Sequence, residues 1–221
     1  MNNKFLIIGQ GSQTIQLLRE LFSLNIRPEN ISILTVDDIS NFSFLEYIKY
    51  YELEFILTNK LNFDKDLEFL LIKNFYLVIS FSNPFIIKSK FLKKSTFINF
   101  HPGILPNYRG SFSTVHSMIN GESEVGGTWH YVSEKVDKGN ILLQTRIKID
   151  LKSTAFSLNH SIFSKGINQL DNVISLVNEK HNGQKQNKSK GIFYHNKFPS
   201  LNKIKDEKLL ERINYFPPKF K

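Results

Sequence analysis

Two polar side chains stand two residues apart, Asn99 and His101, at the end of an apolar run and directly before Pro102. Side chains two apart on a strand point to the same face of a sheet, so we expect the amide and the imidazole to converge. Such a pair suits a reaction that builds negative charge on an oxygen and moves a proton. The structural alternative is a pair that only caps a turn, because histidine is common at both kinds of site.

The elements that would position this pair alternate between strands and helices. Apolar runs predict strands at residues 5–8, 31–36, 54–57, 76–81 and 96–100, with helical periodicity over 15–22 and 66–72. This alternation is typical of the α/β class, here a doubly wound, mostly parallel, Rossmann-like sheet. Ligands of such sheets bind beyond the carboxyl ends of the strands, which is where His101 stands.

The second half of the chain is less regular. It predicts a helix at 113–119, strands at 126–132 and 141–149, a helical stretch over 153–178, a polar loop at 180–190 and a short helix at 206–213. Residues from 191 onward are expected to form a small hairpin or extended tail. We therefore predict a core domain at 1–178 and a C-terminal extension at 179–221 that packs on it.

Composition limits the kind of protein. The 221 residues are 41% hydrophobic and 22% charged, as in globular proteins, and the absence of cysteine excludes disulfide scaffolds, thiolate metal sites and cysteine nucleophiles. No apolar run is long enough for a signal peptide or a membrane span, so we expect a cytoplasmic protein without a membrane partner. The net charge of +9 comes from scattered lysines without a basic stripe, so no nucleic-acid partner is predicted.

The motif around His101 is longer than the pair alone. The chain reads NFHPGILPNYRG from Asn99, WHYV from Trp129 and DKG from Asp137. In order and spacing these segments resemble the folate-dependent formyltransferases, most densely over residues 97–146. The resemblance implies an α/β formyltransferase core, 10-formyltetrahydrofolate as the formyl donor and a primary amine as the acceptor. No metal is expected, since no set of carboxylates and histidines has ligand spacing.

The resemblance also implies catalytic roles for Asn99, His101 and Asp137. Attack of an amine on the formyl carbon gives a tetrahedral intermediate, and the Asn99 amide and a protonated His101 suit its oxyanion. Asp137 would hold the other imidazole nitrogen or relay the amine proton. The structural alternative for Asp137 is an ordinary turn aspartate followed by glycine.

In such enzymes the pterin lies between the loop after the fourth strand and the loop that bears the aspartate. Backbone groups do much of this recognition, and two of the phenylalanines there suit the core equally well. The predicted donor-binding residues are Ser80, Phe81, Ser82, Asn83, Phe85, Val132 and Ser133.

The acceptor is predicted less directly. The loop Gly9-Gln10-Gly11-Ser12 fails as a dinucleotide fingerprint, because Thr14 stands where a third glycine belongs, but a similar loop holds the substrate phosphate in the purine-pathway branch of the family. Arg109-Gly110, Trp129-His130-Tyr131 and Phe216-Pro217-Pro218 instead resemble the sugar N-formyltransferases. We therefore favour a nucleotide-linked amino-dideoxysugar, first dTDP-4-amino-4,6-dideoxyglucose, as in O-antigen biosynthesis. The predicted substrate-binding residues are Gly9, Gly11, Ser12, Asn107, Tyr108, Arg109, Gly110, His116, Trp129 and Tyr131.

Several alternatives stay open. A lone strand tryptophan is more often in the core, and His116 suits packing as well as substrate contact. Phosphoribosylglycinamide formyltransferase of purine synthesis and a non-catalytic folate or sugar-nucleotide binding module are the other functions considered. A tRNA acceptor is disfavoured, because the chain past the last motif is too short for the further domain of those family members. A homodimer is left open.

Overall fold

The computed structural model describes residues 3–187, 191–195, 198–202 and 204–214. The segment Phe216-Pro217-Pro218, which contributed to the predicted sugar branch, lies outside the described residues.

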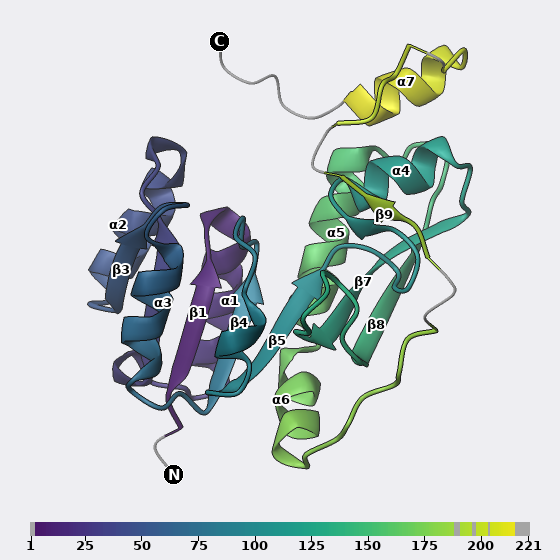
Figure 1. Ribbon diagram of the computed structural model, residues 1–221. Helices are drawn as coiled ribbons and strands as arrows, with labels where there is room; N and C mark the ends of the chain where they lie inside the picture. The colour runs from purple at the N-terminus through teal and green to yellow at the C-terminus, as the bar shows by residue number, and fades with distance from the viewer. Residues whose placement is uncertain (1–2, 188–190, 196–197, 203, 215–221) are drawn as a thin grey trace.

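A seven-stranded sheet forms the centre of the protein (Figure 1). Its order is β3-β2-β1-β4-β5-β7-β8, with β1 to β5 parallel and β7 antiparallel to both of its neighbours. The predicted doubly wound, mostly parallel α/β fold is therefore confirmed. The strands are β1 (Phe5–Gly9), β2 (Ile31–Val36), β3 (Glu54–Thr58), β4 (Leu77–Phe81), β5 (Thr96–His101), β7 (Glu124–Tyr131) and β8 (Ile141–Lys148).

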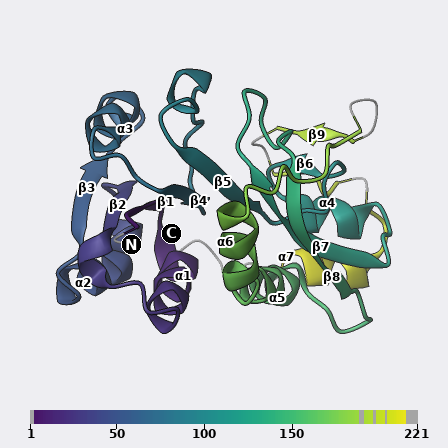
Figure 2. The same ribbon diagram turned by 90° about the horizontal axis from the view of Figure 1, so that it is seen from below.

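Helices cover both faces of this sheet (Figure 2). The helices α1 (Gly11–Ser23), α2 (Phe42–Tyr50), α5 (Ala155–Ile167) and α6 (Leu170–Asn178) bury apolar side chains on one face, and α3 (Phe63–Leu71) does so on the other. Successive residues of β1 alternate between these two cores, as the strand period of two requires. Short 3₁₀ turns occupy Pro28–Asn30, Ile39–Asn41 and Ser89–Phe91.

One predicted helix is two helices. The stretch over 153–178 breaks at Asn168 and Gln169, between α5 and α6. Gly166 lies just before the break, and its Cα packs so closely on the Phe100 ring that a Cβ there would collide with it. A residue of low helix propensity at this contact favours the end of the helix.

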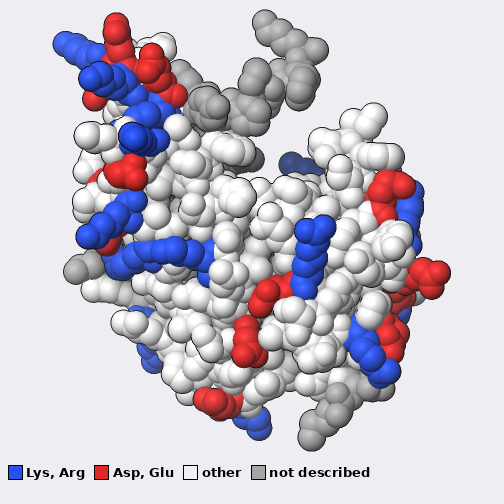
Figure 3. Space-filling model, turned by 180° about the vertical axis from the view of Figure 1, so that it is seen from behind, with Lys and Arg blue, Asp and Glu red and all other residues white. Residues whose placement is uncertain are grey.

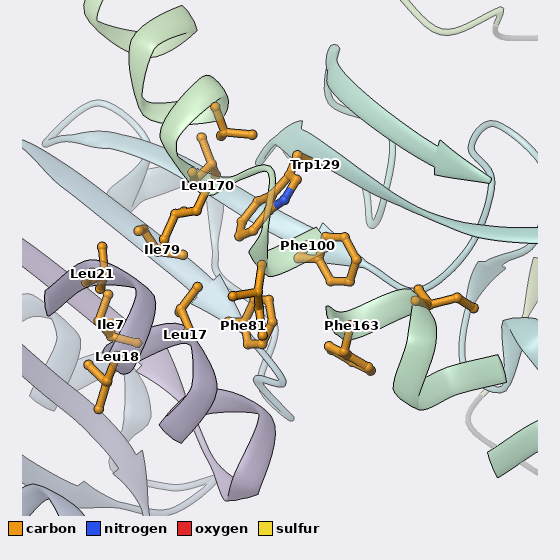
Figure 4. Close-up of a cluster of buried hydrophobic side chains, with 14 of the residues drawn as sticks. Ile7, Leu17, Leu18, Leu21, Ile79, Phe81, Phe100, Trp129, Phe163 and Leu170 are labelled. Carbon is orange, nitrogen blue, oxygen red and sulfur yellow. The ribbon is translucent and has the colours of Figure 1, made fainter. Parts of the chain in front are cut away.

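Four aromatic side chains form the centre of the larger core (Figure 4). The Phe81 ring lies 5.5 Å from the Phe100 ring, 5.8 Å from the Trp129 ring and 5.4 Å from the Phe163 ring, measured between centroids. Trp129 is fully buried, and its indole N–H donates to the Gly166 carbonyl at 2.8 Å. The prediction that Trp129 contacts the substrate is therefore wrong, because its strand turns this side chain to the core. The Phe81 side chain is equally buried and can meet a ligand only through its backbone.

The C-terminal segment returns to the middle of the chain. Strand β9 (Phe193–Tyr194) pairs in parallel with β6 (Arg109–Gly110), rather than with a second strand of the predicted hairpin. Two backbone hydrogen bonds hold this pairing, from Arg109 N–H to Ile192 O and from Ser111 N–H to Tyr194 O. Helix α7 (Glu207–Asn214) packs against α4 (Ser113–Ile119) and α5 and buries Ile213 in the larger core.

No helix within the described ranges is both long and apolar enough to cross a membrane. On the face seen in Figure 3, the coloured Lys and Arg side chains lie singly or beside acidic ones and form no continuous stripe.

We expect Phe81→Ala to lower the free energy of unfolding by about 3–5 kcal/mol, because it leaves a cavity among three aromatic rings. Urea unfolding followed by the fluorescence of the single tryptophan measures this change. Phe69→Ala on α3 is the matched control, since that side chain is 59% exposed. Equal losses in the two variants would contradict the packing described here.

Candidate active site

A cleft of about 590 Å³ opens at the carboxyl ends of β4 and β5. Ile98 and Phe100 of β5 face the larger core, and the alternating residues Asn99 and His101 face the cleft. The three predicted catalytic residues all line it. So do Ser80, Ser82, Asn83, Phe85, Val132 and Ser133 of the predicted donor site and Gly110 of the predicted acceptor site.

His130 was absent from the predicted site residues, and it lies at its centre. It stands directly opposite Asn99 in the antiparallel pairing of β5 with β7. Its Nδ1 is 2.8 Å from the Tyr131 carbonyl oxygen, which can only accept, so this nitrogen carries the proton. Nε2 then accepts from Asn99 Nδ2 at 3.1 Å. The sequence carried one signal for it: His130 alternates with the two aromatic residues of its strand, so one of the two faces had to meet the cleft.

Asp137 lies between the two histidines. Its Oδ2 is 3.5 Å from His101 Nδ1 and accepts from Gly110 N–H at 2.8 Å, and its Oδ1 is 3.6 Å from His130 Nε2. Burial raises the pKa of the Asp137 carboxyl, but the two imidazoles and the Gly110 amide outweigh burial and hold it well below its usual range. The carboxylate is therefore ionised throughout the neutral range.

His101 has a partner at each ring nitrogen. Its Nε2 donates to the Tyr108 carbonyl at 2.7 Å, with the Ser113 hydroxyl 3.3 Å away, and Nδ1 faces Asp137. Burial lowers the pKa of His101, and the Asp137 carboxylate and the Tyr108 carbonyl offset only part of this effect. Since neither nitrogen is left for a ligand, this geometry favours a role for His101 through Asp137 over direct donation to an oxyanion.

The loop after β4 is organised by one side chain. Asn83 Nδ2 donates to the Phe85 carbonyl at 3.0 Å, and Asn83 Oδ1 accepts from Phe85 N–H at 2.9 Å. Ser82 at the start of the loop has a φ of 54°. The Phe85 ring packs on Phe63, with 4.7 Å between centroids, and still borders the cleft. The loop therefore presents backbone groups and one aromatic ring to a ligand.

The opposite wall combines the Arg-Gly turn with the C-terminal segment. Gly110, Ser111 and Phe112 border the cleft together with Phe193 and Tyr194. Gly110 has a φ of 87°, and a Cβ there would collide with the Tyr194 carbonyl. Only glycine therefore lets β9 approach so closely while the Gly110 amide bonds Asp137.

Several predicted acceptor residues serve this wall without bordering the cleft. Arg109 is buried and donates to the Gly191 carbonyl at 2.6 Å, contrary to the predicted substrate contact. Tyr108 donates to Glu122 at 2.5 Å, and the His116 ring stacks on Tyr194 with 3.7 Å between centroids. Asn107 is exposed.

The backbone of the Gly9–Ser12 loop bonds and packs against other residues of the same chain. The Gly11 N–H donates to Asn41 Oδ1 at 2.9 Å, and a Cβ at Gly9 would collide with the Phe81 carbonyl of the neighbouring strand. Ser12 is exposed, and none of the three residues borders the cleft. The glycines thus have structural roles, contrary to the predicted ligand contact.

Tyr131 borders a second hollow, of about 490 Å³, behind the Asp137 loop. Its hydroxyl donates to the His181 carbonyl at 2.7 Å, so it packs the C-terminal segment rather than the cleft. Across the described parts of the chain, no group of three or more His, Asp or Glu side chains could hold a metal ion.

The arrangement suits proton transfer beside a developing oxyanion. One Asn99 N–H bonds His130, and no described residue occupies its second N–H or its Oδ1, which leaves them for a ligand. A proton taken up at His130 Nε2 or His101 Nδ1 would lie against the Asp137 carboxylate. Such an anion stabilises positive charge on either imidazole.

Comparison with known proteins agrees with this chemistry. The family model described as "Formyl transferase" matches residues 68–174. A sugar N-formyltransferase of Shewanella has a similar structure at a TM-score of 0.74 and 21% identity, covering 95% of this chain and 86% of that one. WlaRD, a sugar 3N-formyl transferase solved with dTDP and 5-N-formyl-THF, also has a TM-score of 0.74 and 21% identity. This similarity covers 91% of the present chain and 72% of WlaRD.

A curated relative is similar along most of its length. GDP-perosamine N-formyltransferase of Brucella melitensis is 32% identical over 176 residues, which are 78% of this chain and 68% of the relative. An identity of this size over more than two thirds of both chains shows that the protein belongs to the formyl transferase family.

Proposed function

We propose that this enzyme transfers the formyl group of 10-formyltetrahydrofolate to the primary amine of a nucleotide-linked amino sugar. The observation that carries the proposal is the convergence of Asn99, His130 and the ionised Asp137 in an open cleft. The likeness to the Brucella GDP-perosamine N-formyltransferase supports the sugar acceptor.

The cleft fits the donor on its β4 side. The Phe85 ring and the side chains of Ile87 and Val132 offer apolar surface for a flat pterin, and Ser80, Ser82 and backbone groups offer polar contacts. WlaRD, whose fold this chain shares, was solved with 5-N-formyl-THF. The bound donor supplies the formyl carbon that the acceptor amine attacks.

In the proposed reaction, the free N–H of Asn99 donates to the formyl oxygen as negative charge develops on it. The His130 imidazole fixes this amide, because its Nε2 accepts the other N–H. Asp137 attracts the proton that the amine loses, and a proton reaches the donor nitrogen as its bond to the formyl carbon breaks and tetrahydrofolate leaves. On the far side of Asp137, His101 is fixed by the bond from its Nε2 to the Tyr108 carbonyl, so a proton taken up at its Nδ1 would lie against the carboxylate.

We place the acceptor against the aromatic wall of Phe112, Phe193 and Tyr194, where a base or a deoxysugar face could pack. The relative at 32% identity makes GDP-perosamine the first acceptor to test. The dTDP-linked 4-amino-4,6-dideoxyglucose expected from the sequence is the second acceptor to test, and the dTDP in the WlaRD structure supports its inclusion.

Two other functions remain as outcomes of the test. A glycinamide ribonucleotide acceptor is disfavoured because Asn41 already occupies the Gly11 amide of the loop expected to hold the phosphate. A binding module without turnover is disfavoured because a binder has no use for an ionised carboxylate shared by two imidazoles.

We further propose that residues 1–178 form the catalytic domain and 179–221 an extension packed on it. Gln186, Tyr194 and Ile213 of that extension all contact the remainder of the chain.

We expect GDP-perosamine or the dTDP-linked amino sugar to exceed glycinamide ribonucleotide in kcat/KM by at least roughly a hundredfold, because binding energy from the nucleotide positions the amine. Purified enzyme with 10-formyltetrahydrofolate and each acceptor in turn tests this. A preference for glycinamide ribonucleotide would move the protein to the purine branch, and no turnover with any amine would support the binding module.

We expect Asn99→Ala and Asp137→Asn each to lower kcat roughly a hundredfold or more, because each removes a group that acts on the developing charge. His101→Ala should lower it similarly, through the loss of support for Asp137. Asp171→Asn on the exposed side of α6 is the matched control. Near wild-type kcat in a well-folded variant would remove that residue from the mechanism.

We expect kcat/KM to fall as the pH drops from 8 to 6, because the attacking amine must be neutral. Asp137 should contribute no inflection in this range, since its lowered pKa keeps it ionised. Burial lowers the pKa of His101, so this ring should protonate at a lower pH than a free imidazole does. A profile that stays flat between pH 6 and 8 with chemistry rate-limiting would contradict this order of events.

A further inference from the structure

Gln186 reaches the catalytic loop from the C-terminal segment. Its Nε2 donates to the Asp137 carbonyl at 2.9 Å and to the Gly139 carbonyl at 2.7 Å. One side-chain amide thus bonds the backbone on both sides of Lys138. Both partners are carbonyl oxygens, which only accept, so they fix the orientation of the Gln186 amide, and its Oε1 is buried without a hydrogen-bond partner among the described residues.

The segment that carries Gln186 is itself anchored beside the loop. Gln184 exchanges two backbone hydrogen bonds with Ile141, at 2.7 and 2.9 Å, and Asn140 Nδ2 donates to the Asn182 carbonyl at 2.8 Å. The backbone of 182–186 is therefore fixed relative to the start of β8.

The Asp137 loop has little other backbone support. Residues 134–136 and 138 are exposed, and the backbone bond inside the loop runs from Lys138 N–H to Lys135 O. Within the described residues, Gln186 makes the only hydrogen bonds that reach the backbone of 133–139 from outside the loop. Asp137 also has a φ of 53°, a conformation that a non-glycine residue keeps only when its surroundings hold it.

Asp137 is thus held at both of its ends, at its carbonyl by the C-terminal segment and at its carboxylate by a strand that pairs with this segment. Gln186 binds its carbonyl, and Gly110, whose strand pairs with β9, binds its carboxylate.

We propose that Gln186 is a positioning residue, whose amide holds the Asp137 loop so that the carboxylate stays between His101 and His130. This role rests on the proposed function of the cleft. Loss of both N–H donors would displace the carboxylate, and a displacement of about 1 Å in a catalytic group costs up to a hundredfold in rate.

The test compares Gln186→Met, which keeps the length of the side chain and removes both donors, with Gln184→Met. Gln184 is the matched control, because it lies on the same segment and its side chain is exposed. We expect Gln186→Met to lower kcat by about tenfold or more, with KM for donor and acceptor changed by less than about threefold. Gln184→Met should match the wild type. Equal kcat in both variants, or a loss carried by KM alone, would overturn the proposal.

A second measurement does not depend on turnover. The imidazole signals of His101 in the folded protein, followed by NMR against pH, report the nearby carboxylate, which raises the pKa of that ring. In Gln186→Met we expect His101 to titrate at a lower pH than in the wild type, and in Gln184→Met at the same pH. An unchanged His101 titration in Gln186→Met would show that Asp137 had not moved and would refute the positioning role. If the wild type formylates no sugar nucleotide, the proposed function fails, but this titration still tests whether Gln186 positions the Asp137 carboxylate.

Discussion

A buried carboxylate needs hydrogen-bond donors or positive charge around it, and Asp137 imposes this constraint on the whole cleft. Its side chain is only 10% exposed, and an unmatched charge at such a position would cost several kcal/mol. The match comes from His101, His130 and the Gly110 amide, which belong to three different strands. Any two of the three are at least nine positions apart in the sequence, so the fold has to bring them together.

The seven-stranded sheet brings His130 to the side of His101 through a single antiparallel strand. Because β7 runs against β5, His130 lies opposite Asn99 and shares its face, whereas the next pair, Trp129 and Phe100, shares the core face. One strand pairing therefore supplies both the polar cluster and the aromatic layer beneath it. The tight packing of that layer limits how far the backbone under Asn99 and His130 can move, which is what a preorganised site requires.

Sequence reasoning reached the parts of the site that local periodicity controls. Asn99 and His101 converge because strand side chains two apart share a face, and the apolar runs located each strand of the sheet. The same reasoning missed His130, because the register between β5 and β7 depends on contacts distant in sequence. Arg109 and Gly11 were assigned ligand contacts, yet their polar groups bond Gly191 and Asn41, and no local pattern specifies partners 82 and 30 residues away. The pairing of β9 with β6 escaped prediction for the same reason.

The two halves of the cleft are built in different ways, and this bears on how acceptor choice is controlled. Asn99 and His130 stand on regular strands, whereas the aromatic wall proposed for the acceptor includes β9, a two-residue strand in an irregular segment. Irregular segments tolerate insertion and substitution better than sheet strands, so such a wall is where related enzymes with different acceptors are expected to differ. In this protein, however, the segment that completes the wall also bonds Asp137 through Gln186 and supports Gly110 through β9. If Gln186 positions Asp137 as proposed, a change that reshapes the wall for another acceptor also shifts the carboxylate. Acceptor preference and turnover would then be coupled through Gln186 and β9, and substitutions that disturb these contacts would change both together.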